Sequence, residues 1–150
     1  MTLPVSDAQV LALRAFLSHA TDEMAPLAYQ LGDTGITGYL RLADTALSLL
    51  ARRRFPRYSN ADLVRYVASV RRERLSEGDA YDINPVVGED VMRFSLGVPV
   101  LPQPPQDRLQ AVIALLDALS VSELHTAADI DELLAEARVL GDQWLAGEQR

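Results

Sequence analysis

The chain contains no cysteine and no lysine among its 150 residues. Without cysteine it has no disulfide framework, no cysteine-ligated zinc or iron–sulfur site and no thiol nucleophile. All fourteen basic residues are arginine, which is typical of a protein encoded by a GC-rich genome. These absences remove several classes of redox, metal and thiol chemistry.

Long apolar runs are also lacking. The longest purely apolar run is Ala111 to Leu116, whereas about 20 such residues are needed to span a bilayer. The segment from Met1 to Ala8 has no basic stretch followed by an apolar core, as a signal peptide would. We therefore expect a cytoplasmic bacterial protein that does not interact with membranes.

The composition favours a compact fold. Hydrophobic residues make up 49% of the chain and charged residues 23%, and a chain of this length buries roughly 70% of its unfolded surface. We expect a single helical domain over residues 1–150. It would comprise a main helical part at 1–97, a Pro-rich connector at 98–106 and a C-terminal helical pair at 107–147.

Apolar residues recur at the three- and four-residue steps of amphipathic helices, and no long segment alternates with period two. The sequence therefore predicts an all-α fold, a compact bundle of six or seven helices. Cap signatures place several of the helix starts. These signatures are Ser6 with Gln9, Ser59 with Asp62, Asn84 before Pro85, and Thr126 with Asp129.

Proline and glycine suggest where the first helices end. Pro26 lacks an N–H and should stop or kink the first helix near Met24 to Ala25. The glycines at 32, 35 and 38 indicate a loop, after which a third helix starts near Tyr39. That helix is apolar enough to be central, with Leu47 on its buried face.

No convergent catalytic or metal site is apparent from residue spacing. His19 and His125 are the only histidines, and neither has a second histidine one turn away, as a helical metal pair requires. Ser18, His19 and Asp22 are sequence neighbours, which rarely adopt the geometry of a catalytic triad. We predict no catalytic residues, no metal and no cofactor.

Two other patterns are more typical of ordinary structure. The acidic cluster of Asp129, Asp131, Glu132 and Glu136 lacks the glycine of a calcium loop and is typical of a solvated helix face. The three glycines lack the spacing, preceding strand and lysine of phosphate-binding loops.

Charge is the most informative asymmetry in the sequence. The net charge is −7, yet residues 51–75 carry eight arginines and only two acids. Residues 76–150 carry four arginines and fourteen acids. A basic segment in an acidic chain either pairs internally or presents a basic face to a partner.

The leading interpretation is a non-catalytic protein-interaction module of adaptor, regulatory or immunity type. It would bind an acidic protein partner through Arg53, Arg57, Arg65 and Arg72. The alternative is a DNA- or RNA-binding regulator that uses the helix-turn-helix-like segment 52–74, with Arg65, Arg71 and Arg72 as contacts. A third interpretation is an enzyme with a small-molecule pocket between helices. The acidic total argues against general nucleic-acid binding.

A resemblance is carried by three central runs, Phe55-Pro56-Arg57-Tyr58-Ser59, Asp82-Ile83-Asn84-Pro85 and Phe94-Ser95-Leu96-Gly97. Together they resemble small all-helical proteins of unknown function from high-GC actinobacteria. The resemblance covers about a third of the chain and includes no catalytic motif. It implies a bacterial origin and a cytoplasmic setting and transfers no function.

Overall fold

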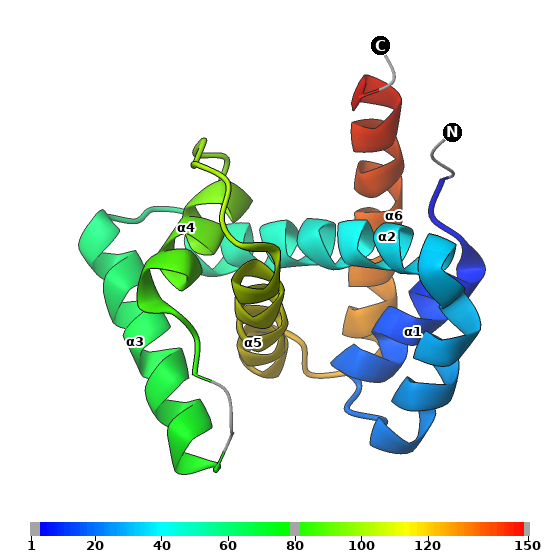
Figure 1. Ribbon diagram of the computed structural model, residues 1–150, viewed down its shortest axis with the longest axis horizontal. Coiled ribbons are helices and arrows are strands. Elements are labelled where there is room, and N and C mark those ends of the chain that lie inside the picture. The colour runs from blue at the N-terminus through cyan, green and yellow to red at the C-terminus, as the bar shows by residue number, and fades with distance from the viewer. Residues whose placement is uncertain (1–3, 79–81, 149–150) are drawn as a thin grey trace. The chain divides into compact units, whose positions relative to one another are not determined.

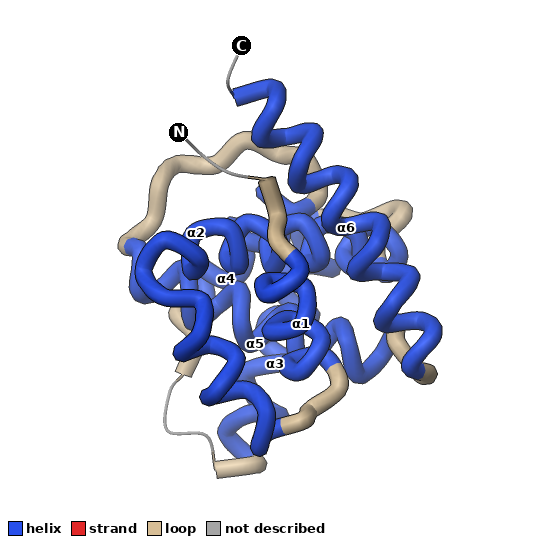
Figure 2. Tube along the Cα trace, turned by 90° about the vertical axis from the view of Figure 1, so that its right-hand side faces the viewer, coloured by secondary structure: helices blue, strands red, loops and turns tan. Residues whose placement is uncertain are grey.

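The computed structural model describes residues 4–78 and 82–148, and those residues form helices and loops without a strand (Figures 1 and 2). The all-α prediction is therefore confirmed. The elements are α1 (Asp7–Leu17), α2 (Thr21–Arg54), α3 (Asn60–Ser76), α4 (Pro85–Ser95), α5 (Pro105–Glu123) and α6 (Ala127–Glu148). Because Gly32 interrupts α2, the described part of the chain holds seven helical segments.

The predicted helix starts are confirmed. Ser6 and Gln9 form a capping box, in which the Gln9 N–H donates to Ser6 Oγ and the Ser6 N–H donates to Gln9 Oε1. Ser59 and Asp62 form the same reciprocal pair at α3. These bonds satisfy N–H groups that have no partner within the helix.

The end predicted for the first helix is wrong. α1 stops at Leu17, and His19 takes a left-handed conformation with φ of 58°. The N–H of His19 donates to Phe16 O and that of Ala20 to Ala15 O, which is a Schellman termination. Because the left-handed residue is histidine rather than glycine, the sequence did not indicate this end. Pro26 lies inside α2, about one turn after its start.

The predicted glycine loop is also wrong. Only Gly32 leaves the helical conformation, with φ of 65°, and Gly35 and Gly38 lie inside α2. Gln9 Nε2 donates to Gly35 O at 2.9 Å. The absent side chain of Gly38 makes room for Gln9, since a Cβ there would lie 2.2 Å from Gln9 Nε2. Gly38 therefore serves the packing of α1 against α2, and Gly35 supplies a carbonyl that accepts from Gln9.

The residues group into two compact units. Unit 1 comprises Met1–Leu49 and Leu124–Arg150, and unit 2 comprises Leu50–Glu123. The expected C-terminal helical pair is thus divided, because α5 belongs to unit 2 and α6 to unit 1. The single-domain organisation stays a prediction.

In unit 1, α1 packs against α6. Leu13, Leu47 and Leu133 are almost completely buried, so Leu47 lies in the core as expected. The two ends of the unit are tied by the Val5 N–H, which donates to Asp142 Oδ1 at 2.8 Å. Arg138 pairs with Asp7 at 2.6 Å.

In unit 2, α4 packs against both α3 and α5, and α3 contacts α5. Gly88 of α4 lies against Val67 of α3, where a Cβ would come within 2.9 Å of Val67 Cγ1. Close approach of the two helices therefore depends on this glycine. Leu63, Met92 and Leu115 are fully buried between these elements.

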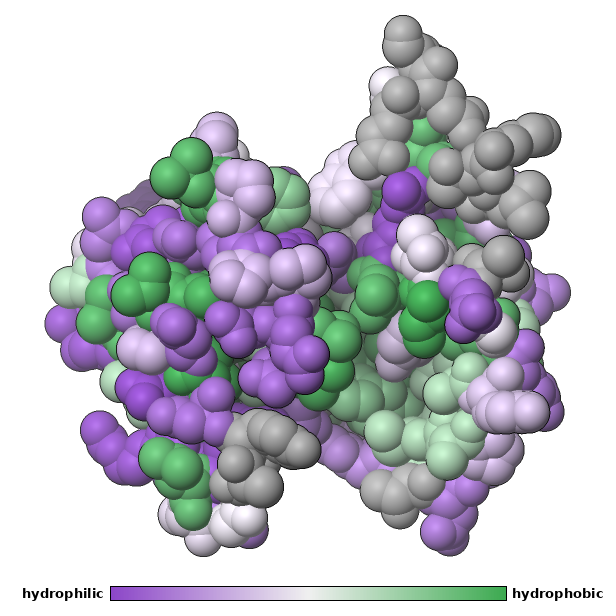
Figure 3. Space-filling view, viewed as in Figure 1, coloured by the Kyte–Doolittle hydropathy of each residue, from purple (hydrophilic) through white to green (hydrophobic). Residues whose placement is uncertain are grey.

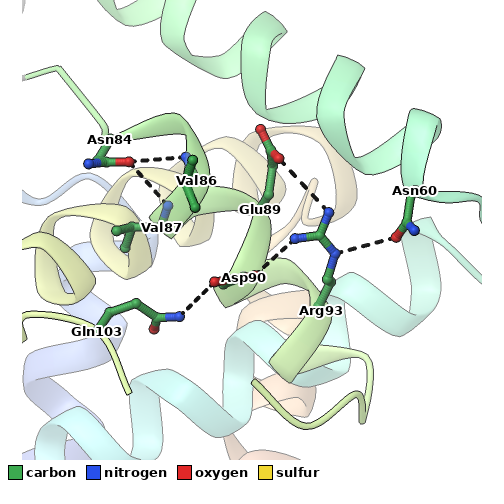
Figure 4. A network of polar contacts seen from close by, with 8 residues as sticks. All are labelled: Asn60, Asn84, Val86, Val87, Glu89, Asp90, Arg93 and Gln103. Carbon is green, nitrogen blue, oxygen red and sulfur yellow. Dashed lines mark hydrogen bonds and ion pairs between the residues drawn. The ribbon is translucent and has the colours of Figure 1, made fainter. Parts of the chain in front are cut away.

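A polar network fixes the start of α4 and the Pro-rich connector (Figure 4). Asn84 Oδ1 accepts from the N–H groups of Val86 and Val87. Asp90 accepts from Arg93 Nη1 at 2.9 Å and from Gln103 Nε2 at 3.1 Å. Arg93 Nε also donates to Asn60 Oδ1 at 3.3 Å. The connector is thus hydrogen-bonded to α4, which is in turn bonded to the start of α3.

Candidate functional site

The four arginines predicted to bind a partner all belong to unit 2 and are all exposed. Arg53 lies in the last turn of α2, Arg57 in the loop that follows, and Arg65 and Arg72 in α3. We refer to these four residues as the arginine surface.

Arg65 and Arg72 share the outer side of α3. They are seven residues apart, which returns a helix to nearly the same direction. Leu63, Val67 and Val70 are buried on the opposite side. The apolar stripe of α3 therefore determines which way these two arginines point.

The arginine surface is only partly paired. Arg65 forms an ion pair with Asp62 at 2.6 Å, and both side chains are solvent-exposed. Such exposed pairs contribute about 1 kcal/mol or less, so Arg65 is available to a competing carboxylate. The structure gives Arg57 and Arg72 no hydrogen bond or ion pair within its described residues.

The carboxylate of Asp62 is stabilised mainly by the helix cap. Hydrogen bonds from the backbone and hydroxyl of Ser59 lower the pKa of Asp62, and Arg65 adds to this effect. The capping bonds with Ser59 therefore stabilise the Asp62 carboxylate more than its ion pair with Arg65 does.

Arg71, a candidate nucleic-acid contact in the sequence, has a local partner. Its Nε and Nη2 donate to the two carboxylate oxygens of Asp82 at 2.9 and 2.5 Å. This hydrogen bond is also the main reason that the pKa of Asp82 lies below its usual value. The bidentate pair connects α3 to the segment before α4.

Charge is distributed differently between the units. Unit 2 contains ten arginines and ten acidic residues, whereas unit 1 contains four arginines and eleven acidic residues. The arginines of the basic segment are therefore matched in number by acidic residues of the same unit, and the acidic excess of the chain lies in unit 1. Counting charges over consecutive segments of the sequence could not show this difference between the units, because unit 1 is built from both ends of the chain.

A cleft between α3 and α5 was missed by sequence reasoning. It has a volume of about 310 Å³, and its lining includes Tyr66, Glu73 and Arg74 of α3 and Asp117 of α5. The spacing of Ala114, Asp117, Ala118 and Val121 along one side of α5 is the signal that could have located it.

Tyr66 is the most perturbed group in this cleft. Burial, above all, raises its pKa to about 12, and its ring packs edge-on against Phe55 with centroids 5.1 Å apart. At neutral pH the hydroxyl is therefore protonated and can donate a hydrogen bond but cannot act as a base. The cleft therefore offers polar side chains for contact with another molecule.

The structure also places the serine and histidine that follow α1. Ser18 Oγ donates to Arg14 O at 2.8 Å in the turn after α1, and His19 is exposed. In the described residues, no three His, Asp or Glu side chains are placed to hold a metal ion. The same residues include no helix long and apolar enough to cross a bilayer.

No protein-family model, curated protein or solved structure matches the chain. The resemblance to actinobacterial helical proteins stays a prediction.

Proposed function

We propose that the chain is a non-catalytic protein-interaction module that binds an acidic protein partner through the arginine surface of unit 2. The observation that supports this most directly is the exposure of Arg53, Arg57, Arg65 and Arg72 on one unit. Exposed guanidinium groups bind carboxylates in a bidentate, directional manner that suits protein recognition.

Nucleic-acid binding is the less favoured alternative. Arg71 is engaged by Asp82, and unit 2 has as many acidic residues as arginines, so little positive excess remains to neutralise phosphates. The outer side of α3 also exposes Val64 and Leu75, which suits a protein surface better than a phosphate backbone.

The test compares capture of proteins from a bacterial lysate by the wild-type chain and by Arg65→Ala/Arg72→Ala, with identification by mass spectrometry. We expect the double variant to lose an acidic partner, and the wild type to lose it as salt is added. Arg138→Ala, which removes an arginine from unit 1 outside the arginine surface, is the control and should retain that partner.

Retention of every wild-type partner by Arg65→Ala/Arg72→Ala would contradict the proposal. Mobility-shift assays at low salt with duplex DNA and single-stranded RNA test the alternative. Retardation that depends on Arg65 and Arg72 would favour a nucleic-acid regulator instead.

A further inference from the structure

Unit 1 contains an open groove between α1 and the beginning of α2. Its volume is about 410 Å³, and its apolar lining comprises Leu11, Ala15, Pro26 and Leu27. Leu11 is 54% exposed although it lies in the middle of α1. Figure 3 shows hydrophobic atoms gathered over α1 and the first part of α2. An apolar groove of this kind is suited to receive apolar side chains from another molecule.

The rim of this groove is acidic. Asp22 and Glu23 line it and are exposed. The one basic residue of the lining, Arg14, forms an ion pair with Asp131 at 2.8 Å, which offsets its charge. Because unit 1 as a whole also has an acidic excess, the groove should bind a partner that presents apolar side chains flanked by basic ones.

The outer side of α3 has this combination of groups. Val64 and Leu75 are 42% and 54% exposed, and Ala68 between them is exposed too. At the helical step of about 100° per residue, these three lie within about 40° of one another, with Arg65 and Arg72 beside them. Figure 3 shows hydrophobic atoms among hydrophilic ones over α3.

We propose that the acidic partner is a second copy of this chain, and that the outer side of α3 in one copy docks into the α1–α2 groove of another. Val64, Ala68 and Leu75 cover the apolar lining, while Arg65 and Arg72 face Asp22 and Glu23. This inference rests on the proposed function, since it assigns the partner of the arginine surface.

The two surfaces lie on different elements, so the contact is heterologous. Each copy uses its groove for one neighbour and its α3 for another, and the assembly grows head to tail or closes into a ring. A symmetric dimer would instead place the same patch on both sides of the interface.

The experiment measures mass by sedimentation velocity over a range of protein concentrations, at low salt and at about 0.5 M salt, where charges are strongly screened. The wild type is expected to form oligomers that dissociate as salt is added. Asp22→Arg/Glu23→Arg and Arg65→Glu/Arg72→Glu should each raise the dissociation constant at least about tenfold.

Mixing these two variants provides the decisive comparison. The first keeps a wild-type α3 and the second keeps a wild-type groove, and the reversed charges of their two altered surfaces are complementary to each other as well. The mixture should therefore regain the association that each variant alone has lost. Circular dichroism of each variant checks that it folds, and the milder Asp22→Asn/Glu23→Gln replaces the first variant if it does not. Val64→Ser/Leu75→Ser should also weaken association.

A wild-type chain that stays monomeric, or a mixture that regains no association, overturns the inference. If the chain is monomeric but Arg65→Ala/Arg72→Ala still loses an acidic lysate protein, the proposed function stands and only the second copy is excluded. If neither surface affects any association, both proposals fail.

Discussion

Gly38 lacks the side-chain carbon that would collide with Gln9, and this local fit joins α1 to α2. Gln9 is buried, although it is polar, and both polar atoms of its amide are hydrogen-bonded. Its oxygen accepts from the Ser6 N–H and its nitrogen donates to Gly35 O. A methyl group at position 38 would displace the amide and break bonds at both ends.

We therefore expect Gly38→Ala to lower the free energy of unfolding by about 1–2 kcal/mol. In a Gln9→Ala background the same change should stabilise the chain, because alanine is favoured over glycine in a helix by roughly 1 kcal/mol. Urea denaturation of the four chains of this double-mutant cycle measures both effects. An equal cost in the two backgrounds would show that Gln9 is not the obstacle.

The cap of α6 makes stability depend on pH. Asp129 accepts from the N–H groups of His125 and Thr126, and these bonds lower its pKa from the ordinary 3.8. A carboxyl group with a lowered native pKa stabilises the fold above its unfolded pKa, and this stabilisation is lost as pH falls through the native value.

Asp129→Asn should therefore cost stability at pH 7, and its difference from wild type should shrink as pH falls from about 5 to 2. Denaturation midpoints measured across this range give the comparison. Glu132→Gln, which removes one negative charge from an exposed position of the same helix, is the control for the loss of charge alone.

For individual residues, the sequence was informative where neighbours along the chain determine the structure. Helical periodicity is sufficient to place Arg65 and Arg72 opposite the buried residues of α3. The pairing of Arg71 with Asp82 could not be predicted, because it depends on how the segment before α4 returns to α3. The cleft beside Tyr66 depends on the packing of α3 and α5 in the same way.

At the scale of elements, α2 consists of two helical segments joined at Gly32, and the second of them supplies much of the core of unit 1. Leu47 is 1% exposed in that segment. An aspartate there would be a buried charge without a partner, which is among the most destabilising changes known for single residues.

We expect Leu47→Asp to lower the free energy of unfolding by at least about 3 kcal/mol, or to prevent folding. Val139→Asp places the same group on an exposed position of α6 and should cost less than about 1 kcal/mol. Thermal and urea denaturation compare the two variants. A loss within about half a kcal/mol at Leu47 would contradict its place in the core.

Helix starts were predictable because a cap is a local hydrogen-bond pattern within four residues, as at Ser6 and Ser59. Helix ends and interruptions were less predictable. Gly35 and Gly38 have the composition of a loop, yet they lie inside α2, where Gln9 packs against Gly38 and donates to Gly35 O. Pro26 lies inside α2 without ending it, and the non-helical backbone of that element falls at Gly32 instead.

For the whole molecule, the two units differ in how far their charges balance. Unit 1 has eleven acidic residues against four arginines, so its acids repel one another at low salt, whereas the numbers are equal in unit 2. The sequence predicted an asymmetry between successive segments, but it could not show that residues 1–49 and 124–150 share one unit.

Added salt should therefore stabilise unit 1 more than unit 2. Raising the salt from about 0.02 to 0.5 M should slow hydrogen exchange of the Leu133 amide in unit 1 several-fold more than that of the Leu115 amide in unit 2. Equal changes at the two amides would show that net charge does not distinguish the units.

The order of the units along the chain has a consequence for biosynthesis. Unit 2 is one continuous stretch, so all of its helices have left the ribosome once Glu123 has emerged. Unit 1 cannot complete its folding until α6 has been synthesised, because α1 packs against that helix. During translation, the first 49 residues therefore remain exposed to chaperones and proteases while the middle of the polypeptide is already able to fold.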